Sequence, residues 1–332
     1  MFKLVDMLTY CRPEGSSTQQ VFNNKYLRPI FGEPDKLGNY ILVIGRRPKI
    51  CFAAHSDTVH TYEGMQTILR EGGILSLPTT SKSSCLGADC TTGVWLILEM
   101  IRANVEGVYV VHAAEEIGCK GSRYINDRFP RWVEELDYCI SFDRKGTSSI
   151  ITHQMGHRTA SDDFAHSLAE ILGMDLQPDT TGSYTDSNEY AKSVSECTNL
   201  SVGYNAQHTN RETQDIAYLE LLRDRLISAD WSKLRASRDP DNVEFLYQAT
   251  GKGHWSGLFE GIEHREVLEG KYPIRSWTEA LEPDDDLLDM TDLVSEHPRK
   301  IAEWLLDQNF TYSELVDFLD LQDAVIPNSH NW

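Results

Sequence analysis

Short runs of apolar, often β-branched residues alternate with longer stretches of helical periodicity over the first 235 residues of this chain. The short runs predict buried β-strands, because they have the length and the residue types of strands inside a sheet. They cover residues 40–44, 50–54, 108–113, 138–142 and 200–204. The stretches between them space apolar residues along one helical face and predict helices at residues 91–104, 160–172 and 213–236.

This alternation predicts an α/β domain over residues 1–235, in which helices cover both faces of a twisted, mixed and largely parallel sheet. The segments 71–77 and 147–152 could add antiparallel or edge strands. Beyond residue 236, turn-forming residues become frequent and no further strand-and-helix unit is evident. Residues 236–332 are therefore predicted to form a small acidic C-terminal extension.

The extension is expected to be partly helical. Its segments 290–308 and 311–321 space apolar residues for short helices. Thr311 and Glu314 can form a capping box at the start of the second segment.

Composition favours a soluble, cytoplasmic protein. Apolar residues make up 40% of the 332 residues and charged residues 25%, which is ordinary for a globular chain. No run of about 18 apolar residues could span a bilayer, and the first residues lack a secretory signal pattern. The seven cysteines are odd in number and irregularly spaced, so free thiols in a reducing compartment are expected rather than a disulfide framework.

A formal net charge of -20 argues against nucleic acid and anionic membrane surfaces as partners. Such partners are bound through Lys and Arg side chains that neutralise phosphates. The acidic surplus either only keeps the protein soluble or also attracts metal ions and substrates with a free amine.

Residues able to bind metal ions come directly after predicted strands. They are His55 and Asp57, Glu115 and Glu116, Asp143, and His208. In an open α/β sheet, ligands bind in the crevice beyond the carboxyl ends of the strands, so residues far apart in sequence can converge there. Asp89 joins them from the turn LGADCTTG, whose glycines allow the backbone to approach a buried ion closely.

This set of residues predicts a centre for two metal ions. Such a centre needs N and O donors and a carboxylate that bridges ions about 3.5–4 Å apart. Asp89 is the candidate bridge. We assign one ion to His55, Asp89 and Asp143, and the other to Asp89, Glu116 and His208, with room for a shared water. Two divalent ions are therefore expected as cofactors, with Zn2+ favoured and Co2+ or Mn2+ as alternatives.

The water also needs a proton acceptor that is not itself a metal ligand. Glu115 is the candidate, because adjacent residues at a strand end point in different directions and can divide the roles of base and ligand. Asp57 is expected to accept the proton on the other nitrogen of His55 and so fix its tautomer. The plainer alternative is a structural histidine and a solvated pair of acids.

Five motifs occur in the order seen in a known superfamily: HSDTVH at 55–60, LGADCTTG at 86–93, EEIGCKGS at 115–122, FDRKG at 142–146 and GYNAQHT at 203–209. Together they resemble the di-zinc (co-catalytic) exopeptidases, which include aminopeptidases, carboxypeptidase-like enzymes and N-acyl amino-acid deacylases. The resemblance implies a phosphorylase/hydrolase-like zinc exopeptidase fold. It also implies His55, Asp89, Glu116, Asp143 and His208 as ligands, Glu115 as base and Asp57 as the residue that orients His55.

The sequence departs from the family pattern at two points, which bear on the metal contacts and on the branch of the superfamily. Cys90 stands where the family usually has a second acidic residue, and it is either an inert core residue or a softer contact near the metals. The stretch between Asp143 and His208 is too short for the inserted lid and dimerisation domain of the carboxypeptidase-like branch. The aminopeptidase-like branch is therefore expected.

The predicted function is hydrolysis of a peptide or aminoacyl-amide substrate, with a water shared by the two metals as the attacking group and Glu115 as general base and then acid. A carboxypeptidase or deacylase is the alternative within the superfamily. The alternative of another class is a metal-bearing scaffold without turnover that binds a protein partner through the C-terminal extension. A homo-oligomer is compatible with either.

Several other polar residues have no motif support as ligands. The segment 181–190 is either a flexible linker or, through Asp186, part of the surroundings of the site. His112, His153, His157 and His166 are predicted to be structural or surface residues.

Overall fold

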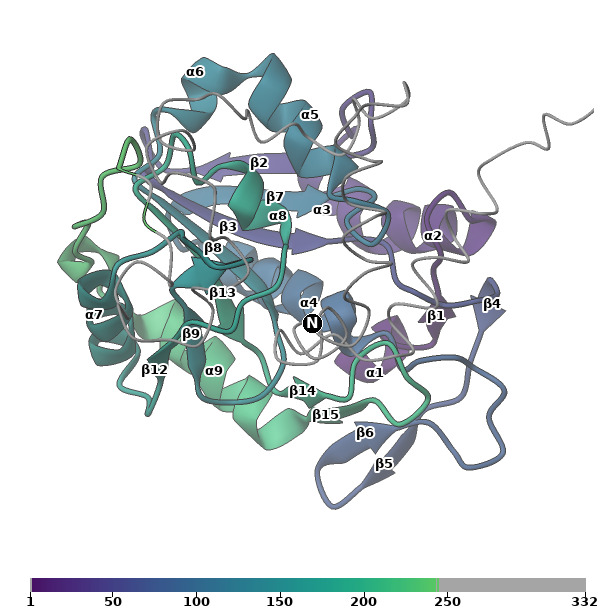
Figure 1. The fold of residues 1–332 in the computed structure, drawn as a ribbon. Helices are drawn as coiled ribbons and strands as arrows, with labels where there is room; N and C mark the ends of the chain where they lie inside the picture. Colours follow the sequence, from purple (N-terminus) through teal and green to yellow (C-terminus); the bar gives the residue numbers. More distant parts are fainter. Residues whose placement is uncertain (1, 243, 245–332) are drawn as a thin grey trace, which may run out of the picture. The chain divides into compact units, whose positions relative to one another are not determined.

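A seven-stranded mixed sheet forms the centre of the protein (Figure 1). The computed structural model describes residues 2–242 and residue 244. In spatial order the strands are β12 (Gln177–Asp179), β9 (Ser149–Ile151), β13 (Glu196–Ser201), β8 (Tyr138–Arg144), β3 (Ile50–His55), β7 (Gly107–His112) and β2 (Tyr40–Ile44). The pairs β13–β8, β8–β3, β3–β7 and β12–β9 are parallel, whereas β2–β7 and β9–β13 are antiparallel. The predicted α/β class and mixed, largely parallel sheet are confirmed.

Helices cover both faces of this sheet (Figure 1). One face carries α4 (Ala88–Arg102), α7 (Asp162–Leu172) and α9 (Ile216–Ser228), and the other carries α5 (Lys120–Arg128), α6 (Pro130–Val133) and α8 (Asp186–Glu189). Side chains of β3 alternate between the two layers, since Phe52 packs in the larger hydrophobic cluster and Cys51 in the smaller one. Burial on both faces explains why the strand sequences read as continuous apolar runs.

Smaller elements surround the sheet. A four-stranded antiparallel sheet contains β14 (Tyr204–Asn205), β15 (Thr213–Asp215), β6 (Ile74–Ser76) and β5 (Leu69–Glu71), in that order. Two-stranded pairs are β1 (Tyr10–Cys11) with β4 (Gly64–Met65), and β10 (His153–Gln154) with β11 (His157–Arg158). Short helical elements are α1 (Leu4–Met7), α2 (Ser17–Phe22), a π-helical turn (Asn23–Leu27), α3 (Arg28–Phe31) and a 3-10 turn (Trp231–Lys233).

Two predicted elements differ from the observed ones. The strand predicted at 200–204 is β13 at Glu196–Ser201, because polar residues such as Thr198 occupy buried strand positions and make hydrogen bonds there. The helix predicted at 213–236 is shorter. Its first residues form β15, Asp215 then caps α9 by accepting a hydrogen bond from the Tyr218 N–H at 3.0 Å, and the backbone is extended again at Ala229. The segments 71–77 and 147–152 contain strands, as predicted.

The domain boundary predicted at residue 235 stays a prediction, and the helices predicted at 290–308 and 311–321 lie outside the described residues. Residues just beyond 235 pack against the domain, since the Arg238 guanidinium donates hydrogen bonds to the carbonyl oxygens of Val194 and Ser195. Within the described residues, no helix is both long and apolar enough to cross a membrane. All seven cysteines are buried free thiols.

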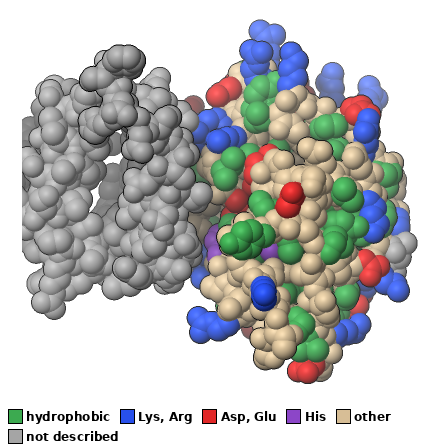
Figure 2. Space-filling model, turned by 90° about the vertical axis from the view of Figure 1, so that its right-hand side faces the viewer, with side chains coloured by type: hydrophobic (Ala, Val, Ile, Leu, Met, Phe, Trp, Pro, Cys, Tyr) green, Lys and Arg blue, Asp and Glu red, His purple; other side chains and the backbone are tan. Residues whose placement is uncertain are grey.

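Charged side chains are mixed on the face of the protein seen in Figure 2. Lys and Arg side chains lie mainly around its outline, with acidic and hydrophobic side chains between them. The described residues therefore form no single acidic patch on this face.

Glu196 joins β13 to the segment after residue 235. Its fully buried carboxylate accepts hydrogen bonds from the Ser161 N–H and hydroxyl at 2.6 and 2.9 Å, and from the N–H groups of Ser237 and Arg238 at 2.7 and 2.9 Å. Glu196→Ala leaves these buried donors without an acceptor, so we expect the free energy of unfolding to fall by roughly 2–4 kcal/mol. Urea unfolding followed by circular dichroism measures this, with the exposed Glu220→Ala as control. Equal stability of the two variants would contradict the role given to Glu196.

Candidate metal centre

The predicted site residues converge at the carboxyl ends of the central strands. His55 is the last residue of β3, and Asp143 lies near the end of β8. Glu115 and Glu116 follow β7 after a sharp turn at Ala114, whose φ of 57° lies in the left-handed region. Asp89 lies at the start of α4, and His208 lies between β14 and β15. We call His55, Asp89, Glu115, Glu116, Asp143 and His208 the candidate metal centre.

Asp89 lies between the two histidines of the centre. Its Oδ1 atom is 3.1 Å from Nε2 of His55, and its Oδ2 atom is 3.2 Å from Nε2 of His208. Each carboxylate oxygen therefore faces a different imidazole. This is the geometry expected of a carboxylate shared by two ion positions.

The remaining acids lie close to one or the other of the two histidines. Nε2 of His55 is 3.4 Å from Oδ1 of Asp143, and Nε2 of His208 is 3.3 Å from Oε2 of Glu116. Oε2 of Glu115 is farther from His55, at 3.8 Å. These side chains thus form two groups that share the Asp89 carboxylate, and Glu115 lies beside the group around His55.

Asp57 is fully buried behind His55. Its Oδ1 atom is 3.3 Å from Nδ1 of His55, the nitrogen that points away from the centre. The same carboxylate accepts hydrogen bonds from the N–H groups of Glu115 and Glu116, at 3.2 and 3.0 Å. Asp57 therefore holds the end of β3 and the turn after β7 in one arrangement.

The first turn of α4 brings Asp89 close to the sheet. Asp89 and Cys90 have non-helical φ and ψ angles, and the peptide bond between them is cis. A Cβ atom on Gly93 would meet the carbonyl oxygen of Phe142, so glycine is needed where α4 begins this close to β8.

Cys90 lies directly beside the candidate metal centre. Its Sγ atom, a ring nitrogen of His55 and a carboxylate oxygen of Asp143 all lie within 4.8 Å of one another. The thiol also donates a hydrogen bond to the carbonyl oxygen of Phe142 at 3.2 Å. The first contact suits a softer metal contact and the second suits a core residue, so both interpretations of Cys90 have an observation behind them.

Sequence reasoning missed the residues that hold Asp143. The Asn199 side chain accepts a hydrogen bond from the Asp143 N–H at 2.9 Å and donates one to its carbonyl oxygen at 3.0 Å. The Thr185 hydroxyl donates to Oδ2 of Asp143 at 2.8 Å, and the Tyr204 hydroxyl donates to its carbonyl oxygen at 2.7 Å. These residues lie 42 to 61 positions from Asp143. The sequence signals were the place of Tyr204 in the last motif and of Thr185 in the segment 181–190.

Glu212 is a fourth missed residue. Its buried side chain accepts hydrogen bonds from the N–H groups of Gly87 at 2.8 Å and Asp89 at 3.0 Å. Burial and the nearby charge of Asp89 raise the pKa of Glu212 to about 8.

The centre concentrates negative charge in a poorly solvated place. Its acidic side chains are 9% to 11% exposed and His55 is 1% exposed, whereas His208 is 33% exposed and marks the open side. Burial, and then the charge of Asp89, raise the pKa of Asp143 to about 7. Burial lowers the pKa of His208, but the charge of Glu116 and a hydrogen bond with Asp89 hold it well above its usual value. These acids need protons or cations to offset their charges.

The donors fit divalent metal ions. One ring nitrogen of His55 and one oxygen each of Asp89 and Glu116 lie within 4.8 Å of one another. The Oε1 atom of Glu116 is buried and has no hydrogen-bond partner among the described residues. Imidazole nitrogen and carboxylate oxygen are ligands that Zn2+ takes, and a bound cation would satisfy this oxygen and offset the charge.

Asp186 belongs to a buried network next to the centre. Its Oδ1 atom accepts a hydrogen bond from the Ser122 hydroxyl at 2.6 Å, and its Oδ2 atom is 3.0 Å from Nδ1 of His112. Nε2 of His112 is 2.7 Å from the hydroxyl of Tyr190. This network ties α8 to α5 and β7. The other three histidines without motif support, His153, His157 and His166, lie on β10, β11 and α7.

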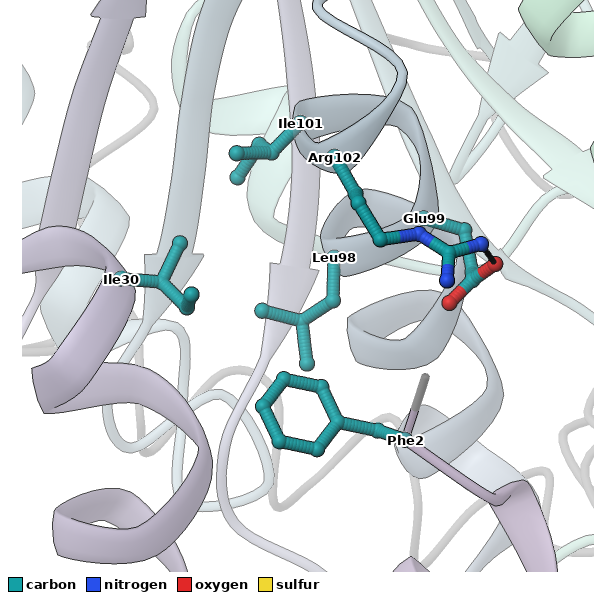
Figure 3. A pocket seen from close by; sticks show the side chains of 6 residues that line it. All are labelled: Phe2, Ile30, Leu98, Glu99, Ile101 and Arg102. Carbon is teal, nitrogen blue, oxygen red and sulfur yellow. Dashed lines mark hydrogen bonds and ion pairs between the residues drawn. The ribbon is translucent and has the colours of Figure 1, made fainter.

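A small cavity lies away from this centre, at the other end of α4. Its volume is about 130 Å³, and its lining is mostly apolar, with Arg102 paired to Glu99 at one side (Figure 3). Leu98 and Ile101 line it from the last turns of α4, about 15 Å along the helix from Asp89. It therefore has no direct contact with the candidate metal centre.

Comparison with known proteins finds likeness at the level of structure. No family model matches the chain, and no curated protein sequence matches it. Aminopeptidase PepT from Bacillus cereus superposes with a TM-score of 0.55 at 15% identity, over 68% of this chain and 95% of that one. A tripeptidase from Staphylococcus aureus gives 0.55 at 14% identity, again over 68% and 95%. The TET1 peptidase of Pyrococcus horikoshii gives 0.51 at 17% identity, over 68% and 98%.

At sequence identities this low, the superpositions establish a shared fold alone. Residues 144–207, all of which the structure describes, hold the remaining strands of the sheet with α7 and α8, and no additional domain. The chain therefore shares the fold of these peptidases, and the fold expected from the resemblance of its motifs is confirmed.

Proposed function

We propose that this protein is a zinc-dependent aminopeptidase, which hydrolyses the peptide or amide bond next to a free amino terminus. The observation that carries the proposal is the position of Asp89, with one carboxylate oxygen at each of two histidines. A buried acid held between two imidazoles, with further acids on both sides, is suited to two divalent ions.

The ligand roles follow from these contacts. His55, Asp89 and Asp143 would hold one ion, and Asp89, Glu116 and His208 would hold the other. Bound there, two divalent ions acidify a water and polarise the carbonyl group of the substrate. Zn2+ suits this mixture of nitrogen and oxygen ligands, and Co2+ or Mn2+ are the alternatives.

Glu115 has the properties of a general base. It lies beside the group around His55, and it is farther from His55 than the proposed ligands Asp89 and Asp143 are. Burial holds the pKa of Glu115 well above its usual value, so the carboxyl group can keep a proton that it has accepted. Glu115 would take the proton of the attacking water and deliver it to the leaving amine. Asp57 would keep His55 in the tautomer that presents Nε2 to the centre.

The choice of an aminopeptidase rests on the fold. The superposed proteins are an aminopeptidase, a tripeptidase and a TET1 peptidase, and a lid domain is absent from residues 144–207. A carboxypeptidase or an N-acyl amino-acid deacylase is the alternative with the same chemistry. A metal-bearing scaffold is the alternative without turnover, and the position of Glu115 argues against it.

The assembly and location of the protein are further parts of the proposal. The TET1 peptidase is described as forming a tetrahedron or a large octahedral shell, and we extend a homo-oligomeric state, without its size, to this chain. Seven buried free thiols favour a reducing compartment such as the cytoplasm. Light scattering of the purified protein measures the oligomeric state.

Metal removal tests the chemistry. We expect elemental analysis to find about two zinc ions per chain, and a chelator to abolish hydrolysis until zinc is returned. The substrates are aminoacyl p-nitroanilides, each with a free and with an acetylated amine. Release from the free amines alone supports the aminopeptidase, and release from the acetylated ones supports the deacylase. Metal without turnover would favour the scaffold, and a protein without metal would contradict the proposal.

The two adjacent glutamates provide a matched pair of variants. Glu115→Gln is expected to lower kcat by about 10²–10⁴-fold and to leave the zinc content unchanged, because only the proton acceptor is lost. Glu116→Gln is expected to lower the zinc content, because a proposed ligand is lost. Turnover numbers and elemental analysis of both variants measure this division. Wild-type turnover in Glu115→Gln, or loss of zinc from it, would refute the role given to Glu115.

A further inference from the structure

Glu212 connects two segments of the chain that are far apart in sequence. Its Oε2 atom accepts the N–H of Gly87 and its Oε1 atom accepts the N–H of Asp89, across 125 and 123 positions. The residue is 1% exposed, so this carboxylate has lost nearly all its contact with water. Burial of a carboxylate is costly unless fixed hydrogen bonds replace water, and the main chain on both sides of Ala88 supplies them here.

Glu212 is poorly suited to be a metal ligand itself. Each of its two oxygens already accepts a main-chain hydrogen bond. Among the described residues, neither group of side chains close enough to share an ion includes it. Its contacts are instead with the main chain of Asp89, the residue whose two oxygens face His55 and His208.

The segment that carries Glu212 also carries His208, four residues earlier. The same segment holds α4 at a second point, because the Thr92 hydroxyl donates a hydrogen bond to the Gln214 side chain at 2.7 Å. His208 and the start of α4 are therefore joined through residues 208–214, and Glu212 is the member of this connection that accepts a hydrogen bond from the main chain of Asp89.

We propose that Glu212 is a positioning residue, which fixes the main chain of Asp89 so that its carboxylate serves both ion positions at once. This rests on the proposed two-metal function. One carboxylate can reach two ions about 3.5–4 Å apart only if its own position is well defined. The position assigned to Glu116 and His208 depends most on Glu212, because His208 belongs to the same segment and is the most exposed residue of the centre.

The experiment is a titration of the metal-free protein with Zn2+ in competition with a chromophoric chelator. In Glu212→Gln one oxygen is replaced by an NH2 group that faces a main-chain N–H, so one of the two hydrogen bonds is lost. We expect the second zinc ion to bind about 10–100-fold more weakly, as for other residues that orient metal ligands, and the first to change by less than about 3-fold.

Thr92→Val is the matched control. It removes a different hydrogen bond between α4 and residues 208–214 and leaves the contacts of Asp89 in place. We expect a lower melting temperature and wild-type affinity for both ions. If Glu212→Gln is unfolded by circular dichroism, Glu212→Asp decides the question instead, because its shorter carboxylate keeps the charge but cannot reach both N–H groups.

Wild-type affinity for both ions in the folded Glu212 variant would overturn the inference. Equal weakening of the second ion by Thr92→Val would also overturn it, since the effect would then be general loosening of the segment. Both results leave the proposed function intact, because the wild-type protein still binds two ions. A wild-type protein that takes up no zinc would refute the proposed function and this inference together.

Discussion

The placement of Asp89 between His55 and His208 is the constraint on which the rest of the site depends. Its two oxygens face two imidazoles at nearly equal distances, 3.1 and 3.2 Å, and three further acids surround them with little exposure to water. Such a group of carboxylates is unfavourable unless cations or protons compensate its charge. The charge supports the proposal that a cation binds here, and the division of the two oxygens supports two ions rather than one.

The scaffold meets this constraint with buried hydrogen bonds from several elements. Asp57 joins the end of β3 to the turn after β7, Asn199 on β13 holds the main chain of Asp143 on β8, and Glu212 holds the turn before α4. Parallel strands bring their carboxyl ends to one edge, so each of these contacts is short in space although long in sequence. Rigidity at this edge favours fixed ligand geometry, which a metal-assisted reaction requires.

The sequence predicted the fold class and singled out acids and histidines that the structure brings together, because both follow from local patterns. Apolar runs of strand length and the acids and histidines that follow them are visible without any structure. The predicted strand at 200–204 was displaced to Glu196–Ser201, because this strand is buried with polar residues whose partners lie on other elements. Glu212 and Thr185 were missed for the same physical reason, since a hydrogen bond across 123 or 42 positions leaves no periodic trace. For Cys90, sequence and geometry leave the same two interpretations, a core thiol and a soft contact.

The measurement that tests the central claim most directly is a crystal structure of the zinc-loaded protein, with anomalous scattering recorded on both sides of the zinc absorption edge. The account predicts two zinc peaks about 3.5–4 Å apart, one on each side of the Asp89 carboxylate. One peak would lie near His55 and Asp143, and the other near Glu116 and His208. A single peak away from Asp89, or none at this edge of the sheet, would contradict the account.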